Sequence, residues 1–435
     1  MFHTAVQIVK TLQKAGHTAY WAGGSVRDML LGKTPQDFDI ATSAKPEEIE
    51  ALFEKTYAIG KSFGVITTEL NGHHFEIATF RSDAGYSDGR RPDAVIFSHP
   101  AEDAKRRDFT INGLFFDPVN EEIHDFVGGQ NDLQNKLIRF IGDPHERILE
   151  DHLRIVRAVR FKTVLNFGYH PDTYEALKKH AKLADKVSFE RLRDELNKML
   201  MNPHADKGFE DMQDTGLLPV ILPELEACKG VAQPMEYHQE GDVWTHLMQS
   251  LRSLPEDASL LARWAVLFHD IGKPQTFKIA ERIRFDHHAE VSGDLAESIM
   301  RRLKFSRRDI EHVSWVVRHH FMMLQLLEMP LGRKRHWFLD PRFPDLLLLY
   351  YADAAGTTPT DLSLFERVKA EYEETLAHFE AKPIPLMSGE EVMKTLNLKA
   401  GPEVGKVLDE LMEKQLSHEI TEKTQALEWL ETLKH

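Results

Sequence analysis

Two aspartates one residue apart, Asp37 and Asp39, lie in the stretch WAGGSVRDMLLGKTPQDFDIAT, residues 21–42. Alternate side chains of a β-strand point to the same face, so a strand over DFDIAT would direct both carboxylates to one point. Two carboxylates at one point suit Mg²⁺, which neutralises phosphate charge and activates a hydroxyl during phosphoryl transfer. An isolated Asp-x-Asp pair is more often a solvated loop or strand end. The pair therefore predicts a metal site only in combination with its neighbours.

The residues before the pair read as a strand, a tight glycine turn and the start of a helix. Gly23 and Gly24 form the turn, and Arg27 follows one helical turn later. Free backbone amides at such a point can hold phosphate, and an arginine can pair with it. The alternative is an ordinary strand-to-helix turn with an exposed arginine. Metal pair and phosphate turn together predict a nucleotide substrate.

The elements that must position these residues change character along the chain. Residues 4–15 predict an amphipathic helix, and residues 19–22 a short strand. GVITTEL and HHFEIATF flank Asn71-Gly72, and GLFFD and EEIHDF flank a Pro-Val-Asn turn, so both pairs predict hairpins. Apolar residues at helical spacing follow over residues 146–161, 171–180, 189–200 and 207–214. We therefore expect a mixed α/β region and then a helical one, with the boundary between residues 126 and 145.

The quoted residues resemble the class II tRNA nucleotidyltransferases of the polymerase-β superfamily. That family comprises CCA-adding enzymes, their CC-adding and A-adding relatives, and bacterial poly(A) polymerases. GGSVRDMLLG followed by DFDIAT is similar to its first motif. The resemblance implies an α+β chain with a polymerase-β-like head, Gly24 and Arg27 on the triphosphate, and Asp37 and Asp39 on two Mg²⁺ ions. Glu76, in HHFEIATF, is a candidate third carboxylate, although a surface-facing strand glutamate is the more frequent situation.

Two further stretches resemble family motifs. KRRDFTINGLFF, residues 105–116, implies that Arg107, Asp108 and Asn112 meet the sugar and phosphates of the nucleotide. EDHLRIVRAVRF, residues 150–161, resembles the amino-acid template that reads the incoming base, here Asp151 and Arg154. A carboxylate accepts hydrogen bonds from exocyclic amino groups, and an arginine donates to ring nitrogens or carbonyls.

The same stretch predicts how its charged side chains are arranged. Asp151 and Arg154 are three apart on the predicted helix and are therefore neighbours. Arg157 and Arg160 continue at threes, and a drift of about 60° per step places Arg160 opposite Asp151. We therefore expect Asp151 and Arg154 at the base, and Arg157 and Arg160 turned toward phosphates or the neck. An exposed helix laced by ion pairs is the alternative. SFERLRDELNKML, residues 188–200, is similar to a supporting motif of the neck.

Histidines and aspartates recur in the second half of the chain, on segments that also look helical. Their order resembles that of HD-domain phosphohydrolases. The resemblance implies a site for Ni²⁺, Mn²⁺, Fe, Zn²⁺ or Mg²⁺ at four residues, with two further ligands or phosphate contacts: His246, His269, Asp270 and Asp353, then His288 and His320. Family members with this domain are linked to phosphohydrolysis of damaged RNA ends. A degenerate domain kept for packing or tRNA contact is the alternative.

Composition limits the partners. A formal net charge of -15 over 435 residues argues against a uniformly basic nucleic-acid coat but not against a local basic groove. The only cysteine, Cys228, excludes an internal disulfide and suits a reducing cytoplasm. The N-terminus lacks signal-peptide features, and the longest apolar run, residues 346–352, is too short to cross a bilayer. We expect a cytoplasmic protein that acts on tRNA, with neither DNA nor a membrane as partner.

The expected organisation is a head over residues 1–140, a helical neck over 141–232, an HD-type domain over 233–356 and a helical tail over 357–435. The expected reaction adds CMP and AMP from CTP and ATP to the 3′ end of tRNA. The loop FRSDAGYSDGRRPDAV, residues 80–95, is full length, as in CCA-adding enzymes, whereas CC-adding relatives lack it. An A-adding enzyme, a poly(A) polymerase and a chain that is mainly an HD phosphohydrolase with an RNA-binding head remain alternatives. A noncatalytic RNA-binding module is hard to reconcile with the intact carboxylate pair.

Overall fold

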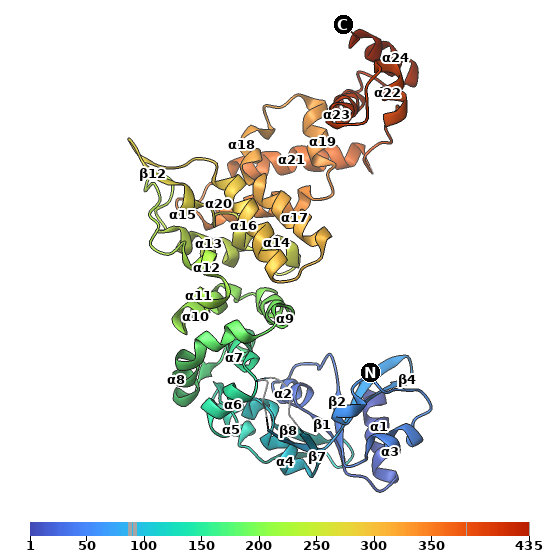
Figure 1. Cartoon of the computed structure of the whole chain (residues 1–435), viewed down its shortest axis with the longest axis vertical. Helices are drawn as coiled ribbons and strands as arrows, with labels where there is room; N and C mark the ends of the chain where they lie inside the picture. Colours follow the sequence, from blue (N-terminus) through green and yellow to red (C-terminus); the bar gives the residue numbers. More distant parts are fainter. Residues whose placement is uncertain (86–88, 90–93, 380, 435) are drawn as a thin grey trace. The chain divides into compact units, whose positions relative to one another are not determined.

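The structure is a computed structural model that describes residues 1–85, 89, 94–379 and 381–434. It divides into two compact units, Met1–Ile221 and Leu222–His435 (Figure 1). The first unit begins with a mixed sheet and continues as helices, and the second is almost entirely helical. The α+β fold class with a helical body is therefore confirmed. In the described part of the chain, no helix combines the length and apolar character that crossing a bilayer requires.

The sheet of the first unit has seven strands in the order β3-β4-β5-β2-β1-β8-β9. Only β2 and β5 are parallel among its paired neighbours, and the other pairs are antiparallel. The strands are β1 (Ala19–Ala22), β2 (Asp39–Thr42), β3 (Thr56–Tyr57), β4 (Val65–Leu70), β5 (His73–Thr79), β8 (Leu114–Asp117) and β9 (Glu122–Asp125). Trp21, Ile40, Ile77 and Phe115 are buried along the central strands, so the rigid middle of the sheet carries the residues at its ends.

Both predicted hairpins are present. Asn71 and Gly72 connect β4 to β5, and both have positive φ, 54° and 76°, as a two-residue hairpin of the right twist requires. β8 and β9 form the second hairpin. A further antiparallel pair, β6 (Arg81–Ala84) and β7 (Ala94–Phe97), takes up both ends of the segment predicted as a loop over residues 80–95. Residues 86–88 and 90–93 of that loop lie outside the described residues, so its length class stays a prediction.

Helices of the first unit surround the sheet and then form the neck. They are α1 (Phe2–Lys14), α2 (Gly24–Leu30), α3 (Pro46–Leu52), η1 (Lys61–Phe63), α4 (Pro100–Lys105), η2 (Thr110–Asn112), α5 (Gly129–Gln134), α6 (Pro144–Glu150), α7 (Leu153–Leu165), α8 (Pro171–His180), η3 (Ala181–Lys186), α9 (Phe189–Leu200), α10 (Ala205–Asp214) and α11 (Leu218–Ile221). Two short strands, β10 (Leu137–Ile138) and β11 (Gly168–Tyr169), pair in parallel. The helix expected over residues 146–161 is wrong as a continuous element, because α6 ends at Glu150 and α7 begins at Leu153.

The second unit is a stack of helices with one small hairpin, β12 (Phe277–Ile279) with β13 (Ile283–Phe285). Its helices are α12 (Pro223–Glu226), α13 (Val243–Ser253), α14 (Leu260–Phe268), α15 (Lys273–Thr276), α16 (His288–Arg302), α17 (Arg307–Arg318), η4 (His320–Met322), α18 (Met323–Leu326), α19 (Leu331–Phe338), α20 (Phe343–Gly356), α21 (Ser363–His378), α22 (Gly389–Leu396), α23 (Pro402–Leu416) and α24 (Lys423–Thr432).

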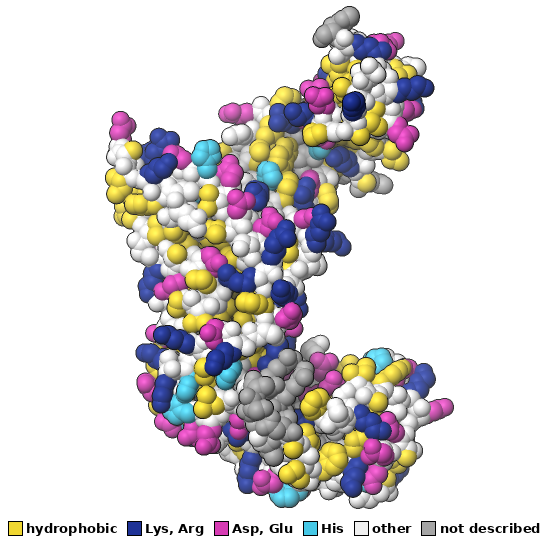
Figure 2. Space-filling model, viewed as in Figure 1, with side chains coloured by type: hydrophobic (Ala, Val, Ile, Leu, Met, Phe, Trp, Pro, Cys, Tyr) yellow, Lys and Arg dark blue, Asp and Glu magenta, His cyan; other side chains and the backbone are white. Residues whose placement is uncertain are grey.

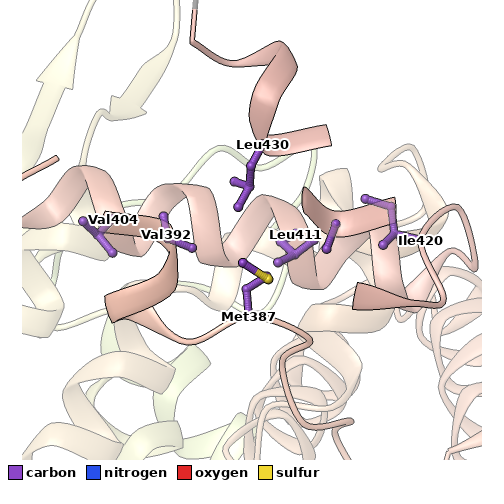
Figure 3. Packing of buried hydrophobic residues seen from close by; sticks show 7 residues of the cluster. Met387, Val392, Val404, Leu411, Ile420 and Leu430 are labelled. Carbon is purple, nitrogen blue, oxygen red and sulfur yellow. The ribbon is translucent and has the colours of Figure 1, made fainter. Parts of the chain in front are cut away.

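The last three helices close on a small core of their own. Val392 of α22, Leu411 of α23 and Leu430 of α24 are fully buried against one another (Figure 3). Met387 and Ile420, from the segments before α22 and after α23, complete the cluster. Burying a side chain of this size contributes about 1.5–3 kcal/mol to the stability of the fold. The apolar faces of these amphipathic helices are therefore buried against one another. On the surface, charges of both signs are interspersed, as Figure 2 shows for one face.

Candidate functional site

A cavity of about 550 Å³ in the first unit gathers the residues predicted to bind nucleotide. It is lined by Asp39 together with Gly24, Arg27, Arg107, Asp108, Asn112, Asp151, Arg154, Arg157 and Arg160. These residues come from segments up to 136 positions apart, as the numbers of Gly24 and Arg160 show. The structure thus brings Asp39 and the predicted nucleotide-binding residues together, whereas Asp37 is not among the described residues that line the cavity.

The lining is strongly cationic, although the chain as a whole is acidic. Among the described residues that line the cavity, seven are cationic and three are carboxylates. Sequence reasoning missed three lining residues, Arg106, Phe161 and Lys198. Arg106 stands beside a predicted residue, whereas Lys198 belongs to α9 and its position on the cavity depends on how α9 packs against α7. A cavity with this excess of positive charge suits a polyanion such as a triphosphate.

One corner of the cavity is acidic. β2 runs parallel to β5 with Ile40 opposite Ile77, so the preceding residues, Asp39 and Glu76, lie side by side on the same face. Partial burial and the negative charges of Glu76 and Asp37 raise the pKa of Asp39, although Arg107 opposes them. Asp39 is still solvent-exposed, so its desolvation is incomplete. The carboxylates of Asp37 and Glu76 therefore repel that of Asp39, which lines the cavity.

This corner has the donor chemistry of a magnesium site. Carboxylate oxygens are the ligands that Mg²⁺ takes in proteins, usually one or two of them beside substrate phosphates. The strand begins at Asp39, so Asp37 lies just before β2 rather than within it, contrary to the expected strand over DFDIAT. Asp37 nevertheless lies close enough to act on the pKa of Asp39.

The glycine turn is required by its surroundings. Gly23 has φ 69° and ψ -126°, a conformation that residues with a side chain adopt rarely. A Cβ at this position would lie 3.1 Å from Nη1 of Arg107 and 4.0 Å from Oδ2 of Asp39. The glycine therefore lets a cavity arginine approach the acidic corner.

A chain of hydrogen bonds links the phosphate turn to the neck. Nη1 of Arg27 donates to Oδ1 of Asn112 at 2.7 Å, and Nδ2 of Asn112 donates to Oδ1 of Asp108 at 3.1 Å. Arg157 donates to the other oxygen of Asp108 from Nε at 2.9 Å and from Nη2 at 2.6 Å. Burial opposes the charged form of Asp108, but Arg157 and Asn112 together lower its pKa to about 2. Asp108 is thus a structural anion that orients two cavity residues.

Asp108 predicts a pH dependence of stability. Its folded-state pKa of about 2 lies below the usual 3.8, so its contribution is present above about pH 4 and is lost as the pH falls toward 2. We expect Asp108→Asn to lower the free energy of unfolding by roughly 2 kcal/mol at pH 7, and this difference to shrink toward pH 2. Urea unfolding followed by circular dichroism at several pH values measures it. Asp185→Asn, at an exposed carboxyl, is the control, and an equal response of both variants would contradict the assignment.

The base-reading residues are arranged differently from the prediction. Asp151 is not helical, because its backbone is extended at φ -145° and ψ 105° in the break between α6 and α7. Its carboxylate pairs with Arg191 rather than with Arg154. Arg154 instead contacts Glu150 at 2.6 Å and donates to the carbonyl oxygens of Arg147 and Arg106. The helical i, i+3 relation predicted for the pair is therefore wrong.

Asp151, Arg154, Arg157 and Arg160 all line the same cavity, although helical spacing alone would start Arg160 on the side opposite Asp151. Asp151 precedes α7, so the change in angular position around the helix axis applies only from Arg154 to Arg160. The long arginine side chains can still reach the cavity from these positions. Phe161 supplies a common surface: the guanidinium groups of Arg27, Arg157 and Arg160 lie 5.2, 5.3 and 3.9 Å from its ring centre. Arg160 also pairs with Glu195 of α9.

A second site lies in the second unit, where the predicted metal ligands converge. His246 lies on α13, His269 and Asp270 follow α14, and Asp353 lies on α20. Nε2 of His246 is 3.2 Å from Nε2 of His269 and 3.0 Å from Oδ1 of Asp353. The ligand atoms of His246, His269 and Asp353 all lie within 4.8 Å of one another.

A neighbouring group uses the two additional histidines. Nε2 of His288 is 3.3 Å from Oδ1 of Asp270, and Nε2 of His320 is 3.9 Å from the same oxygen. The ligand atoms of these three residues also lie within 4.8 Å of one another. The other oxygen of Asp270 is 3.4 Å from His269. Asp270 therefore lies between two groups of ligand atoms.

The histidine tautomers fit metal binding. Nδ1 of His269, His288 and His320 lies 2.7–2.8 Å from a backbone carbonyl oxygen, which can only accept. Each Nδ1 must therefore carry the proton, and each neutral Nε2 presents a lone pair. Nε2 of His288 and of His320 is buried without a hydrogen-bond partner among the described residues. Several lone pairs that face one carboxylate form the donor set of a divalent cation.

Burial and neighbouring charges shift the pKa values at this site in both directions. Asp270 is buried, which opposes its charged form, yet Lys273 and His269 hold its pKa well below the usual range. Burial lowers the pKa of His320 to about 3, with a further contribution from His269. Burial also disfavours a charged His246, but hydrogen bonds to Asp353 and Glu240 raise its pKa to about 9.

Two supporting residues were missed by sequence reasoning. Nδ1 of His246 contacts Oε1 of Glu240 at 3.0 Å, so a carboxylate orients the ring from behind. Nζ of Lys273 lies 2.5 Å from Oδ2 of Asp270 and 2.7 Å from Oε1 of Gln233. Lys273 could have been found in LFHDIGKP, one turn after the aspartate, whereas Glu240 lies in a loop with no such spacing.

Comparison with known families matches three successive segments. Residues 19–139 match the poly(A) polymerase head domain, residues 166–229 match a probable RNA and SrmB binding site of polymerase A, and residues 237–355 match the HD domain. The resemblances drawn from the sequence to the nucleotidyltransferase family and to an HD domain are thus confirmed. A nucleotidyltransferase head and an HD domain imply dependence on divalent metals.

Named relatives and solved structures agree. The CCA-adding enzyme of Lactobacillus helveticus is 41% identical over 269 residues, which cover 60% of this chain and 67% of that protein. The CCA-adding enzyme of Pediococcus pentosaceus is 38% identical over 270 residues, which cover 60% of this chain and 68% of that protein. The crystal structure of the Bacillus stearothermophilus CCA-adding enzyme in complex with CTP is similar at a TM-score of 0.74 and 26% identity, covering 99% of this chain and 97% of that one. This chain therefore belongs to the CCA-adding enzyme family of nucleotidyltransferases.

Proposed function

We propose that the chain adds CMP and AMP from CTP and ATP to the 3′ end of tRNA, without a nucleic-acid template, in the cavity of the first unit. The tRNA 3′-hydroxyl attacks the α-phosphate, a new P–O bond forms, the bond to the β-phosphate breaks, and pyrophosphate leaves. The observation that carries the proposal is the joining, in one cavity, of an acidic corner, a cationic lining and the Asp151–Arg154 pair.

The residues divide the work by their chemistry. Asp37 and Asp39 are the proposed metal ligands, and Mg²⁺ bound there would neutralise the triphosphate and activate the hydroxyl. Arg27, Arg107 and Arg157 face the cavity as phosphate partners, with Gly24 at the turn. Asn112 and Asp108 hold Arg27 and Arg157 in place through the chain of hydrogen bonds.

Base choice follows from hydrogen-bond polarity. Cytosine and adenine both present an amino donor beside a ring-nitrogen acceptor on the Watson–Crick edge, whereas uracil and guanine present a carbonyl beside an N–H. An ionised Asp151 only accepts and Arg154 only donates, so together they complement cytosine and adenine. The same pair would therefore accept CTP and ATP and reject UTP and GTP.

Incubation of the purified chain with tRNA that lacks its last three nucleotides tests the proposal. CTP alone is expected to extend the tRNA by two residues, ATP alone by none, and both together by three. Extension by ATP of a tRNA that ends in CC, without addition of CMP to the shorter tRNA, would identify an A-adding enzyme, and long A tails on unrelated RNA would identify a poly(A) polymerase. No extension with any nucleotide would refute the proposal.

The second unit supports a second activity, metal-dependent phosphohydrolysis. His246, His269, Asp270 and Asp353, with His288 and His320, are the proposed ligands of Ni²⁺, Mn²⁺, Fe, Zn²⁺ or Mg²⁺. A divalent ion held there would supply hydroxide from water near neutral pH. Glu240 orients His246, and Lys273 offers a cation beside Asp270 for a phosphoester oxygen. The buried, unpartnered Nε2 atoms favour this reading over a domain kept only for packing.

The compartment and the limits of the domains are part of the same proposal. One buried thiol, Cys228, suits a reducing cytoplasm. We propose a head over residues 1–140, a neck over 141–232, an HD-type domain over 233–356 and a helical tail over 357–435. The three family matches support this order.

A further inference from the structure

Arg191 forms two hydrogen bonds with the carboxylate of Asp151, which the proposed reaction uses to read the base. It lies on α9, and its Nη1 and Nη2 donate to Oδ1 and Oδ2 of Asp151 at 3.0 and 2.7 Å. Such a two-pronged contact fixes both the position and the plane of a carboxylate. We propose that Arg191 is the positioning residue that sets nucleotide selectivity by orienting Asp151, an inference that rests on the proposed nucleotidyl transfer.

Asp151 needs an external support because of where it lies. In the break between α6 and α7, no helical turn restricts its side chain. Apart from Arg191, the carboxylate has one further hydrogen-bond partner among the residues that the structure describes, the backbone N–H of Leu153, which donates to Oδ1 at 3.1 Å. A short side chain at an extended position would otherwise sample several rotamers. Arg191 therefore decides which of them is populated.

The same contacts leave the Asp151 carboxylate one acceptor position for the amino group of a base. An ionised carboxylate offers about four acceptor positions. Arg191 occupies two and Leu153 one, so the remaining position can take one amino hydrogen of cytosine or adenine. Asp151 lines the cavity, whereas Arg191 is not among the described residues that line it. Arg191 thus acts on the nucleotide through Asp151.

Without Arg191, nearby cations would capture Asp151. Arg154 and Arg157 line the same cavity, and the charge of Asp151 already contributes to the raised pKa of Arg157. A released carboxylate would swing toward one of these guanidinium groups. The Asp151 carboxylate would then accept hydrogen bonds from a guanidinium group instead of from a base. The hydrogen-bond pattern that excludes uracil would be lost.

Helix α9 provides the partners of both Asp151 and Arg160. Glu195 lies one turn after Arg191 on α9 and pairs with Arg160, while Arg191 pairs with Asp151. The i, i+4 spacing places both on the face of α9 that packs against α7. Arg193 lies between them, is half-buried and pairs with the exposed Asp194. The chain therefore offers a matched control on the same helix.

The test compares Arg191→Ala, Arg191→Lys and Arg193→Ala. The readout is kcat/KM for adding one residue from CTP and from UTP to tRNA that lacks its last three nucleotides, with thermal unfolding in parallel. We expect Arg191→Ala to lower the CTP-to-UTP ratio by roughly tenfold to a hundredfold. Arg191→Lys should fall between, because a single ammonium cannot hold both oxygens. Arg193→Ala should keep the wild-type ratio.

A double variant separates positioning from general support. In an Asp151→Ala background, adding Arg191→Ala should leave the ratio unchanged, because the group through which Arg191 acts is gone. An unchanged ratio in Arg191→Ala, or a further fall in the double variant, would overturn the inference. If Arg191→Ala does not fold, Arg191→Lys decides, since a wild-type ratio in that variant also overturns it. Failure of the wild-type chain to add CMP would instead count against the proposed function.

Discussion

Replacing Asp39 by alanine is expected to reduce CMP and AMP incorporation by about a thousandfold or more, because it removes a proposed ligand of the ion that stabilises charge at the reacting phosphate. Asp39 lies at the meeting point of β1, β2 and β5, beside Glu76 and within reach of Asp37. Incorporation of labelled nucleotide into tRNA measures the effect. Glu122→Ala, at an exposed carboxylate of the edge strand β9, is the control and should keep full activity.

The same variant should not lose stability. The carboxylates of Asp37, Asp39 and Glu76 repel one another, so removing one relieves repulsion that the free protein tolerates. We expect the thermal midpoint of Asp39→Ala to equal or exceed that of the wild type. An active Asp39→Ala variant would contradict the assignment, and an inactive variant with a clearly lower midpoint would indicate a structural role instead.

Replacing Asp270 by alanine is expected to weaken divalent-metal binding in the second unit by at least about a hundredfold and to abolish phosphoester hydrolysis there. Asp270 contacts both groups of histidines, through Oδ2 toward His246 and His269 and through Oδ1 toward His288 and His320. Metal content after loading with Mn²⁺, and hydrolysis of a chromogenic phosphodiester, measure the two effects. CMP addition to tRNA should be unaffected, because its proposed ligands lie in the other unit.

The exposed Glu281→Ala, at the tip of the β12–β13 hairpin, is the control for Asp270. It should bind metal and hydrolyse the diester as the wild type does. Retained hydrolysis in Asp270→Ala would contradict the proposed site. Loss of tRNA extension in the same variant would show that the two activities are not separable.

Local signals were sufficient for much of the fold. Asn71-Gly72 predicted a hairpin because that dipeptide adopts positive φ at low cost, and the turn has this geometry. β1 was predicted at its observed limits, Ala19–Ala22, since a short apolar run ends in two glycines. Most of the cavity residues were predicted because the motifs that contain them resemble those of a known family, and only the aspartate pair and the glycine turn were singled out by their own chemistry.

The break before α7 could not be predicted, because apolar spacing runs on through Ile148 and Ile155 as if the helix were continuous. It is stabilised by tertiary contacts, above all the pairing of Asp151 with Arg191, 40 positions away. The Arg157–Asp108 pair likewise depends on tertiary packing, because its residues are 49 positions apart. Partners of this kind depend on how α7, α9 and the head pack, and no periodicity within one segment encodes them.

Anomalous diffraction from crystals grown with CTP and Mn²⁺ tests the proposed reaction most directly. We expect a manganese peak about 2.1 Å from carboxylate oxygens of Asp37 and Asp39, bridging to the triphosphate, with the cytosine amino group at Asp151. A peak away from both aspartates, or a cytosine bound outside the reach of Asp151 and Arg154, would contradict it.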